Sequence, residues 1–65
     1  MKVEYLLTIP TQAAGNLARI YRAKTIAHRD GLRLAKLYGQ DRHTIARIVQ
    51  GDKITVLGET TYRAR

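Results

Sequence analysis

A chain of 65 residues that contains no cysteine has few ways to form a stable fold. A domain of this size buries only about 60% of the surface that its unfolded chain exposes, and disulfides often compensate in such domains. The two histidines, His28 and His43, are far apart in the sequence and have no carboxylate cluster beside them, so a zinc site is not expected. The chain must rely on one small hydrophobic core. We therefore expect a single domain over residues 1–65 that forms a homodimer.

The charge of the chain indicates the kind of partner. Lys and Arg number 12 against five Asp and Glu, which gives a net charge of +7, and most of the excess lies between residues 16 and 50. A polyanion is the expected partner of so basic a domain, and nucleic acid is the first candidate. No apolar run approaches the roughly 20 residues that cross a bilayer, and no signal peptide is recognised. We expect a cytoplasmic, nucleoid-associated protein with no membrane partner.

The first half of the chain is predicted to be a strand followed by a helix. Apolar residues alternate from Lys2 to Ile9, which is typical of a short strand. Pro10 is tolerated in the first turn of a helix, and three- and four-residue apolar spacings then predict a helix over about residues 11–28. Gly15 either breaks this helix or marks the close approach of two backbones.

The second half is predicted to contain two more helices and a hairpin. Residues 30–38 form the second helix, with Asp30 as its N-cap and Gly39 ending it. Residues 41–50 form the third, which carries apolar residues at three- and four-residue spacing. The β-branched and aromatic residues over 53–63 are separated by a turn containing Gly58, which predicts a C-terminal β-hairpin.

Residues 31–50, GLRLAKLYGQDRHTIARIVQ, have the spacing of a helix-turn-helix. Two helices that cross at about 90–120° need a small residue where they meet, a glycine in the turn, and apolar residues that lock them together. Ala35, Gly39, Ile45 and Ile48 occupy these positions. We therefore expect a mostly α fold, in which a short N-terminal strand and a C-terminal β-hairpin accompany a three-helix helix-turn-helix core.

The segment LAKLYGQDRHTIARIV resembles the helix-turn-helix of bacterial and phage regulators. The glycine followed by Arg42-His43-Thr44-Ile45, with a basic residue at Arg47, is similar to the DNA-binding end of the Fis-like family and its NinH-like members in lambdoid phages. The chain departs from that pattern at Asp41 and Ile48, and a Cro-like regulator is the second choice. The resemblance implies sequence-specific binding of double-stranded DNA, with residues 41–50 as the recognition helix in the major groove, in a regulator of transcription or recombination.

This interpretation assigns contacts with DNA to nine residues. Arg42 is the expected base reader because a guanidinium can donate two hydrogen bonds to guanine. Thr44 matches a phosphate contact of the Fis-like pattern, and Arg47 is expected to contact phosphate or a base. The full set is Arg29, Arg33, Lys36, Arg42, His43, Thr44, Ala46, Arg47 and Gln50.

Three other classes of function agree less well with the sequence than DNA binding does. An enzyme is not expected because the chain has no serine or cysteine nucleophile, and its aspartates have neither paired-carboxylate nor metal-ligand spacing. No cofactor and no small-molecule substrate are therefore expected. An RNA-binding module is the nearest alternative, although four tyrosines without Phe or Trp are few for single-strand recognition. A phage-type inhibitor or adaptor that binds a protein is the other alternative, and an exposed apolar or acidic patch would mark it.

Overall fold

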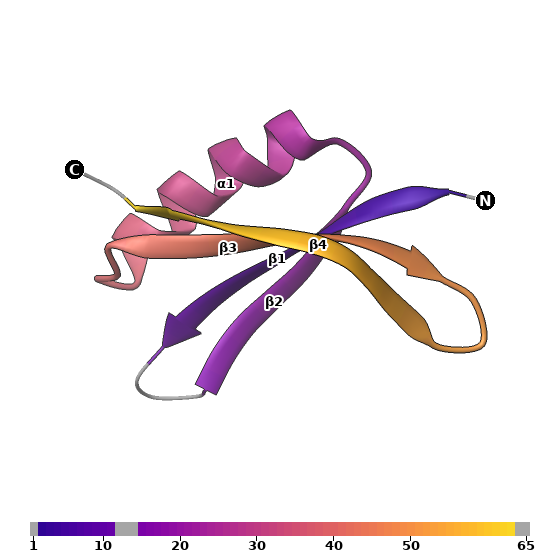
Figure 1. Ribbon diagram of the computed structural model, residues 1–65. Helices are drawn as coiled ribbons and strands as arrows, with labels where there is room; N and C mark the ends of the chain where they lie inside the picture. Colours follow the sequence, from indigo (N-terminus) through magenta and orange to yellow (C-terminus); the bar gives the residue numbers. More distant parts are fainter. Residues whose placement is uncertain (1, 12–14, 64–65) are drawn as a thin grey trace.

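The computed structural model describes residues 2–11 and 15–63, and it contains an antiparallel sheet covered on one face by a single helix (Figure 1). The strands lie in the order β2-β1-β3-β4, so β1 and β3 are central and the other two form the edges. Every neighbouring pair is antiparallel. The elements in chain order are β1 (Val3–Thr11), β2 (Gly15–Tyr21), α1 (Lys24–Leu37), β3 (Arg42–Gln50) and β4 (Ile54–Arg63).

The predicted fold class, a mostly α helix-turn-helix core, is wrong. Residues 15–21, within the predicted helix 11–28, form β2, and the predicted recognition helix forms β3. Residues 12–14 of the predicted first helix lie outside the described residues. The predicted second helix, 30–38, is the C-terminal part of α1, which begins six residues earlier than predicted. The protein is therefore a ββαββ domain with one helix.

The apolar spacing of β3 imitates a helix because this strand is buried on both faces. Ile45, Ile48 and Val49 are three and four residues apart, which is also the pattern of a helical stripe. In the sheet, His43 and Ile45 point toward α1, whereas Ile48 points to the opposite face and is still 0% exposed. A central strand whose side chains are buried on both faces loses the apolar and polar alternation that identifies a half-buried strand.

The predicted N-terminal strand is confirmed and is longer than expected, since β1 continues through Pro10 to Thr11. A proline in a central strand is unusual because it has no N–H to donate. Here β3 pairs with β1 only as far as Thr8, so Pro10 lies beyond the last residue that this neighbour contacts. The proline that suggested a helix entry therefore occupies the end of a strand.

The C-terminal residues are extended, as predicted, but they form one strand rather than a hairpin. The chain turns at residues 51–53, and β4 then pairs with β3 along its length. Gly58 lies inside β4, where the register shifts so that Arg47 pairs with Gly58 and Ile48 pairs with Val56. Leu57 is the extra residue of this irregularity. The glycine therefore marks a bulge in the strand and not a turn.

The core lies between α1 and the two central strands. The buried face of the helix consists of Ala27, Gly31, Leu34 and Ala35, and these pack against Leu7, Ile9 and Ile45 of the sheet. Three of the four helical residues are small, which lets the helix approach the strands closely. At Gly31 the approach is closest, since an added Cβ would lie 2.8 Å from Cγ of His43. Gly39, with φ of 71°, ends the helix in the left-handed conformation, as predicted.

We expect the Gly31→Ala substitution to destabilise the fold. Alanine gains about 1 kcal/mol in a helix relative to glycine, but its methyl group would overlap the buried His43 ring, and overpacking costs about 1–3 kcal/mol. Urea unfolding followed by circular dichroism measures the difference. Gly58→Ala is the matched control because nothing lies within 4 Å of the added Cβ. Equal stability of the two variants would contradict the close helix approach.

Candidate nucleic-acid interface

Alternation along the strands divides the molecule into two sides. The register places Tyr5, Leu7 and Ile45 on the face that packs against α1. The intervening residues, such as Leu6 and Ala46, point to the opposite face, over which the described part of the chain places no helix. We call α1 together with the strand positions that face it the helix side, and the other face of the sheet the open face (Figure 1).

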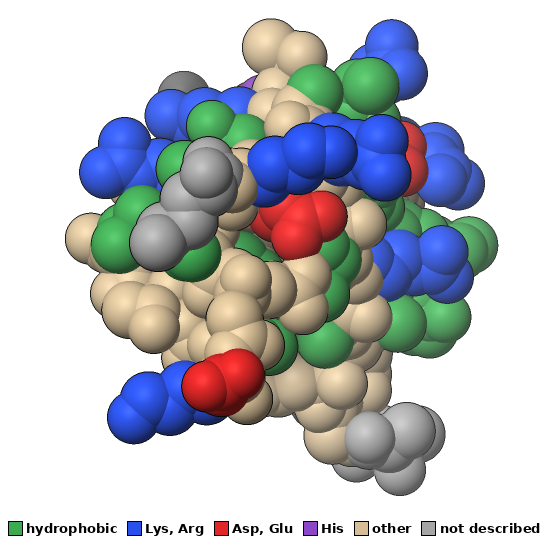
Figure 2. Space-filling model, turned by 90° about the vertical axis from the view of Figure 1, so that its right-hand side faces the viewer, with side chains coloured by type: hydrophobic (Ala, Val, Ile, Leu, Met, Phe, Trp, Pro, Cys, Tyr) green, Lys and Arg blue, Asp and Glu red, His purple; other side chains and the backbone are tan. Residues whose placement is uncertain are grey.

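The basic residues are concentrated on the helix side. Asp30 is the one acidic residue that α1 and the strand positions facing it contribute, which leaves this side with a net charge of +5. On the open face the strand positions carry two arginines, Arg42 and Arg63, and two glutamates, Glu4 and Glu59, for a net charge of zero. Figure 2 shows most Lys and Arg side chains in its upper part, toward α1. The six basic residues of the helix side are Arg19, Lys24, Arg29, Arg33, Lys36 and Arg47.

Three of these residues form a stripe along the outer surface of the helix. Arg29, Arg33 and Lys36 are spaced four and three residues apart, so they lie on one face of α1 over about 10 Å. All three are exposed. The exposed Arg33 guanidinium lies 3.7 Å from the Asp30 carboxylate, an ion pair that is weak because water surrounds it. We call these three residues the basic stripe.

Asp30 also fixes the edge of the sheet to the helix. The Tyr21 hydroxyl of β2 donates a hydrogen bond of 3.0 Å to this carboxylate. Burial raises the pKa of the Tyr21 hydroxyl above its usual value, and the hydrogen bond to Asp30 acts in the same direction. The tyrosine therefore stays protonated and keeps donating at neutral pH. One oxygen of the Asp30 carboxylate is therefore occupied by the tyrosine. The three positive charges of the basic stripe outnumber this one negative charge beside them.

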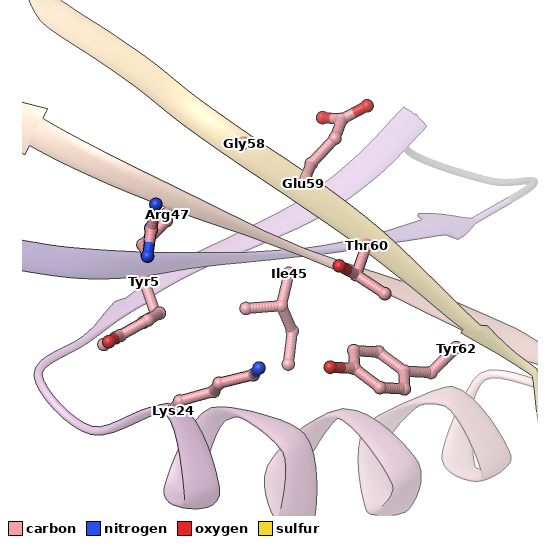
Figure 3. A pocket seen from close by; sticks show the side chains of 8 residues that line it. All are labelled: Tyr5, Lys24, Ile45, Arg47, Gly58, Glu59, Thr60 and Tyr62. Atoms are coloured by element: carbon pink, nitrogen blue, oxygen red, sulfur yellow. The ribbon is translucent and has the colours of Figure 1, made fainter.

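A cavity of about 480 Å³ lies between the start of α1 and strands β3 and β4 (Figure 3). Lys24 extends from α1 toward the Tyr62 hydroxyl, and Glu59 points away from the other side chains. Two cations and two tyrosine hydroxyls therefore surround a space large enough for a phosphate group and part of a sugar or base. The lining residues are Tyr5, Lys24, Ile45, Arg47, Gly58, Glu59, Thr60 and Tyr62.

His43 belongs to a buried aromatic cluster and is only 1% exposed. Its Nε2 atom lies 3.2 Å from Nδ1 of His28, and its ring stacks on Tyr62 with centroids 5.4 Å apart. The His28 ring meets Tyr62 edge on, at 4.6 Å. Burial lowers the pKa of His43 below its usual value, and the neighbouring His28 lowers it further. His43 is therefore neutral at pH 7 and packs inside the domain.

The structure separates the nine residues that the sequence assigned to DNA. The basic stripe and Arg47 lie together on the helix side, whereas His43 is inside the core. Four residues belong to the open face, where Thr44 is hydrogen-bonded to Thr61, Gln50 donates to Glu4, and Ala46 is buried. The fourth, Arg42, lies 3.9 Å from Asp41. In a helix, the predicted contact residues of segment 41–50 would share one surface. In strand β3 they alternate between the helix side and the open face.

Arg19, Lys24 and Tyr5 were not predicted as parts of a binding surface. Arg19 and Lys24 lie between residues 16 and 50, where most of the excess positive charge is found. That excess was the sequence feature that could have identified them as part of a basic surface. Nothing in the sequence brings Tyr5 and Tyr62 together, since they are 57 positions apart and meet only through the pairing of β1 and β4 with β3.

The chain matches no family model, no curated protein and no solved structure. The helix-turn-helix that the resemblance to Fis-like proteins implied is not formed by residues 31–50. No three metal-binding side chains come together within residues 2–11 and 15–63. In the same described ranges, α1 is too short and too polar to cross a membrane.

We expect the folded domain to lose stability as the pH falls below about 6.5. Because the pKa of His43 is lower in the folded protein than the 6.5 of a free histidine, the unfolded chain takes up a proton first. The stabilisation by neutral His43 is complete above that pH, and it falls below it by at most about 1.4 kcal/mol per pH unit. Urea unfolding between pH 5 and pH 8 measures this slope.

The His43→Phe variant keeps the stacked ring but has no titrating group at this position. Its free energy of unfolding should depend less on pH in the same range. An unchanged slope in this variant would assign the pH dependence to another group.

Proposed function

We propose that this protein binds double-stranded DNA, mainly through the phosphate backbone, with the helix side as the contacting surface. The observation that carries the proposal is the unequal distribution of charge, +5 on the helix side and zero on the open face. A cationic surface attracts the phosphates of nucleic acid and releases their counterions, which supplies most of the affinity of non-specific binding.

The shape of the helix side favours a duplex over a single strand. The outer surface of α1 is exposed along its 14 residues, or about 21 Å, and a helix fits the major groove, which is about 12 Å wide. Single-strand binding uses exposed aromatic rings on which bases stack. The tyrosines that the strands contribute to the helix side, Tyr5, Tyr21 and Tyr62, are partly buried against the core. The basic stripe is therefore better suited to phosphates than to unstacked bases.

This mode of binding contacts the phosphates of DNA, whereas a helix-turn-helix also contacts the edges of the bases. Arg42, the base reader expected from the sequence, lies on the open face and faces away from the basic stripe. Arginine and lysine on phosphates position a protein on DNA but carry no sequence information. The proposal therefore requires strong salt dependence and similar affinity for unrelated duplexes.

We expect Arg29→Ala to weaken binding to all duplexes alike. Arg29 is an exposed member of the basic stripe, so its loss removes one phosphate contact and reduces the log–log salt slope by about 0.9. Fluorescence anisotropy with two unrelated 20-base-pair duplexes, at salt concentrations between 50 and 200 mM, measures both quantities. Single-stranded DNA and duplex RNA of matched sequence test the choice of nucleic acid.

Lys53→Ala is the matched control, because Lys53 is equally basic and exposed but lies in the turn between β3 and β4. Its affinity and salt slope should stay near those of the unmodified protein. The proposal is wrong if this variant loses as much affinity as Arg29→Ala, or if single-stranded DNA or duplex RNA binds more tightly than duplex DNA.

A further inference from the structure

The domain exposes more surface than its size requires. Its accessible surface is 4909 Å², whereas a compact monomer of 7.4 kDa exposes about 4200 Å². The excess of about 700 Å² is close to the roughly 800 Å² that each partner contributes to a standard protein interface. A dimer with a standard interface would therefore remove about as much surface from each copy as this excess.

The open face carries exposed apolar side chains. Ile20 of β2 is 45% exposed, and Val56 of β4 is 54% exposed. Ile54 points to the same face and is also exposed. Beneath them lie Ala46 and Ile48, which are buried although no helix among the described residues covers this face. An apolar centre spread over several strands is typical of a surface that packs against another protein.

The charges of the open face suit a second copy of the same chain. Two copies of a chain with a charge of +7 repel each other wherever their basic surfaces meet, and the neutral open face avoids this repulsion. The arginines Arg42 and Arg63 are paired at one end of β3 and β4. Glu59 lies nearer the middle of β4, and Glu4 lies toward the other end, opposite Ile48. A two-fold axis that reverses the strands would bring the arginines of each copy toward the glutamates of the other.

We propose that the open face binds a second copy of this chain, so that two sheets pack face to face with their strands antiparallel. The apolar residues Leu6, Ile20 and Val56 form the apolar centre of the interface, and Ile54, at the far end of β4, lies at its rim. Arg42 and Arg63 of one copy face Glu4 and Glu59 of the other, and the two helices lie on the outside. The inference is independent of DNA binding, which uses the opposite side of the molecule.

Sedimentation velocity at about 100 µM protein and 150 mM salt tests the dimer. The unmodified chain should sediment at twice its mass of 7.4 kDa. Ile20→Glu and Val56→Glu should each weaken the dimer at least tenfold, because each buries a charge in the apolar centre. Both side chains are about half exposed in the single chain, so the variants should keep the circular dichroism spectrum of the fold.

The control is Leu32→Glu, since Leu32 is 43% exposed, nearly the same fraction as Ile20, but lies on α1. This variant should remain a dimer. A monomeric unmodified chain would overturn the proposal, and so would a dimer that tolerates Ile20→Glu. The second result would indicate pairing along the free edge of β4, because Ile20 lies on the opposite edge strand.

A charge exchange tests the antiparallel arrangement. Arg63→Glu alone and Glu59→Arg alone should each weaken the dimer, because each places like charges together across the interface. The double variant restores opposite charges and should recover the affinity of the unmodified chain. If the double variant is as weak as the single variants, the strands of the two copies are not antiparallel as proposed.

Discussion

The fold depends on the close packing of one face of α1 against the two central strands. A four-stranded sheet alone exposes both of its faces, and the one helix that the described residues form covers one of them. Small residues at Ala27, Gly31 and Ala35 let the helix approach until Leu34 reaches the core. The His43 ring fills the space under Gly31, where a larger residue would not fit. The position of the aromatic cluster and of the cavity beside it follows from this contact.

Covering one face also determines where the charges lie. Because strand side chains alternate between faces, the position of α1 separates Arg47, on the helix side, from Arg42, on the open face. The helix itself contributes four basic residues and one acidic residue, most of them outside its buried face. A chain with a charge of +7 thus becomes a domain with one strongly basic side and one neutral face. Each proposed interaction uses the side whose charge suits its partner.

Several elements were predictable from local sequence. The alternation in β1, the extended character of residues 54–63 and the end of α1 at Gly39 all follow from rules that act over a few residues. The charge of the chain likewise indicated a basic surface. These rules apply whether or not it is known which segments of the chain pack together.

The errors lie where burial comes from distant parts of the chain. Leu17, Ile20 and Tyr21 of β2 are spaced as in a helix, but two of them face α1 and the third faces the open face. β3 lies between β1 and β4, so apolar side chains on both of its faces are buried against residues of neighbouring elements. The helix-turn-helix spacing therefore arose by coincidence. Its first two positions, Ala35 and Gly39, lie at the end of α1, and its last two, Ile45 and Ile48, lie in β3. The separation of Arg42 from the basic stripe followed from the same error.

The two proposals together imply an arrangement of DNA that differs from that of a helix-turn-helix dimer. In such a dimer the two recognition helices enter one duplex on the same side, roughly 34 Å apart. Here the open faces meet in the middle, and the two helix sides point in opposite directions. Even the shortest dimension of one copy is 15 Å, so the two basic surfaces are separated by more than the Debye length of about 8 Å and repel each other weakly. A single straight duplex can contact only one of them, which makes the proposed dimer suited to holding two duplexes together.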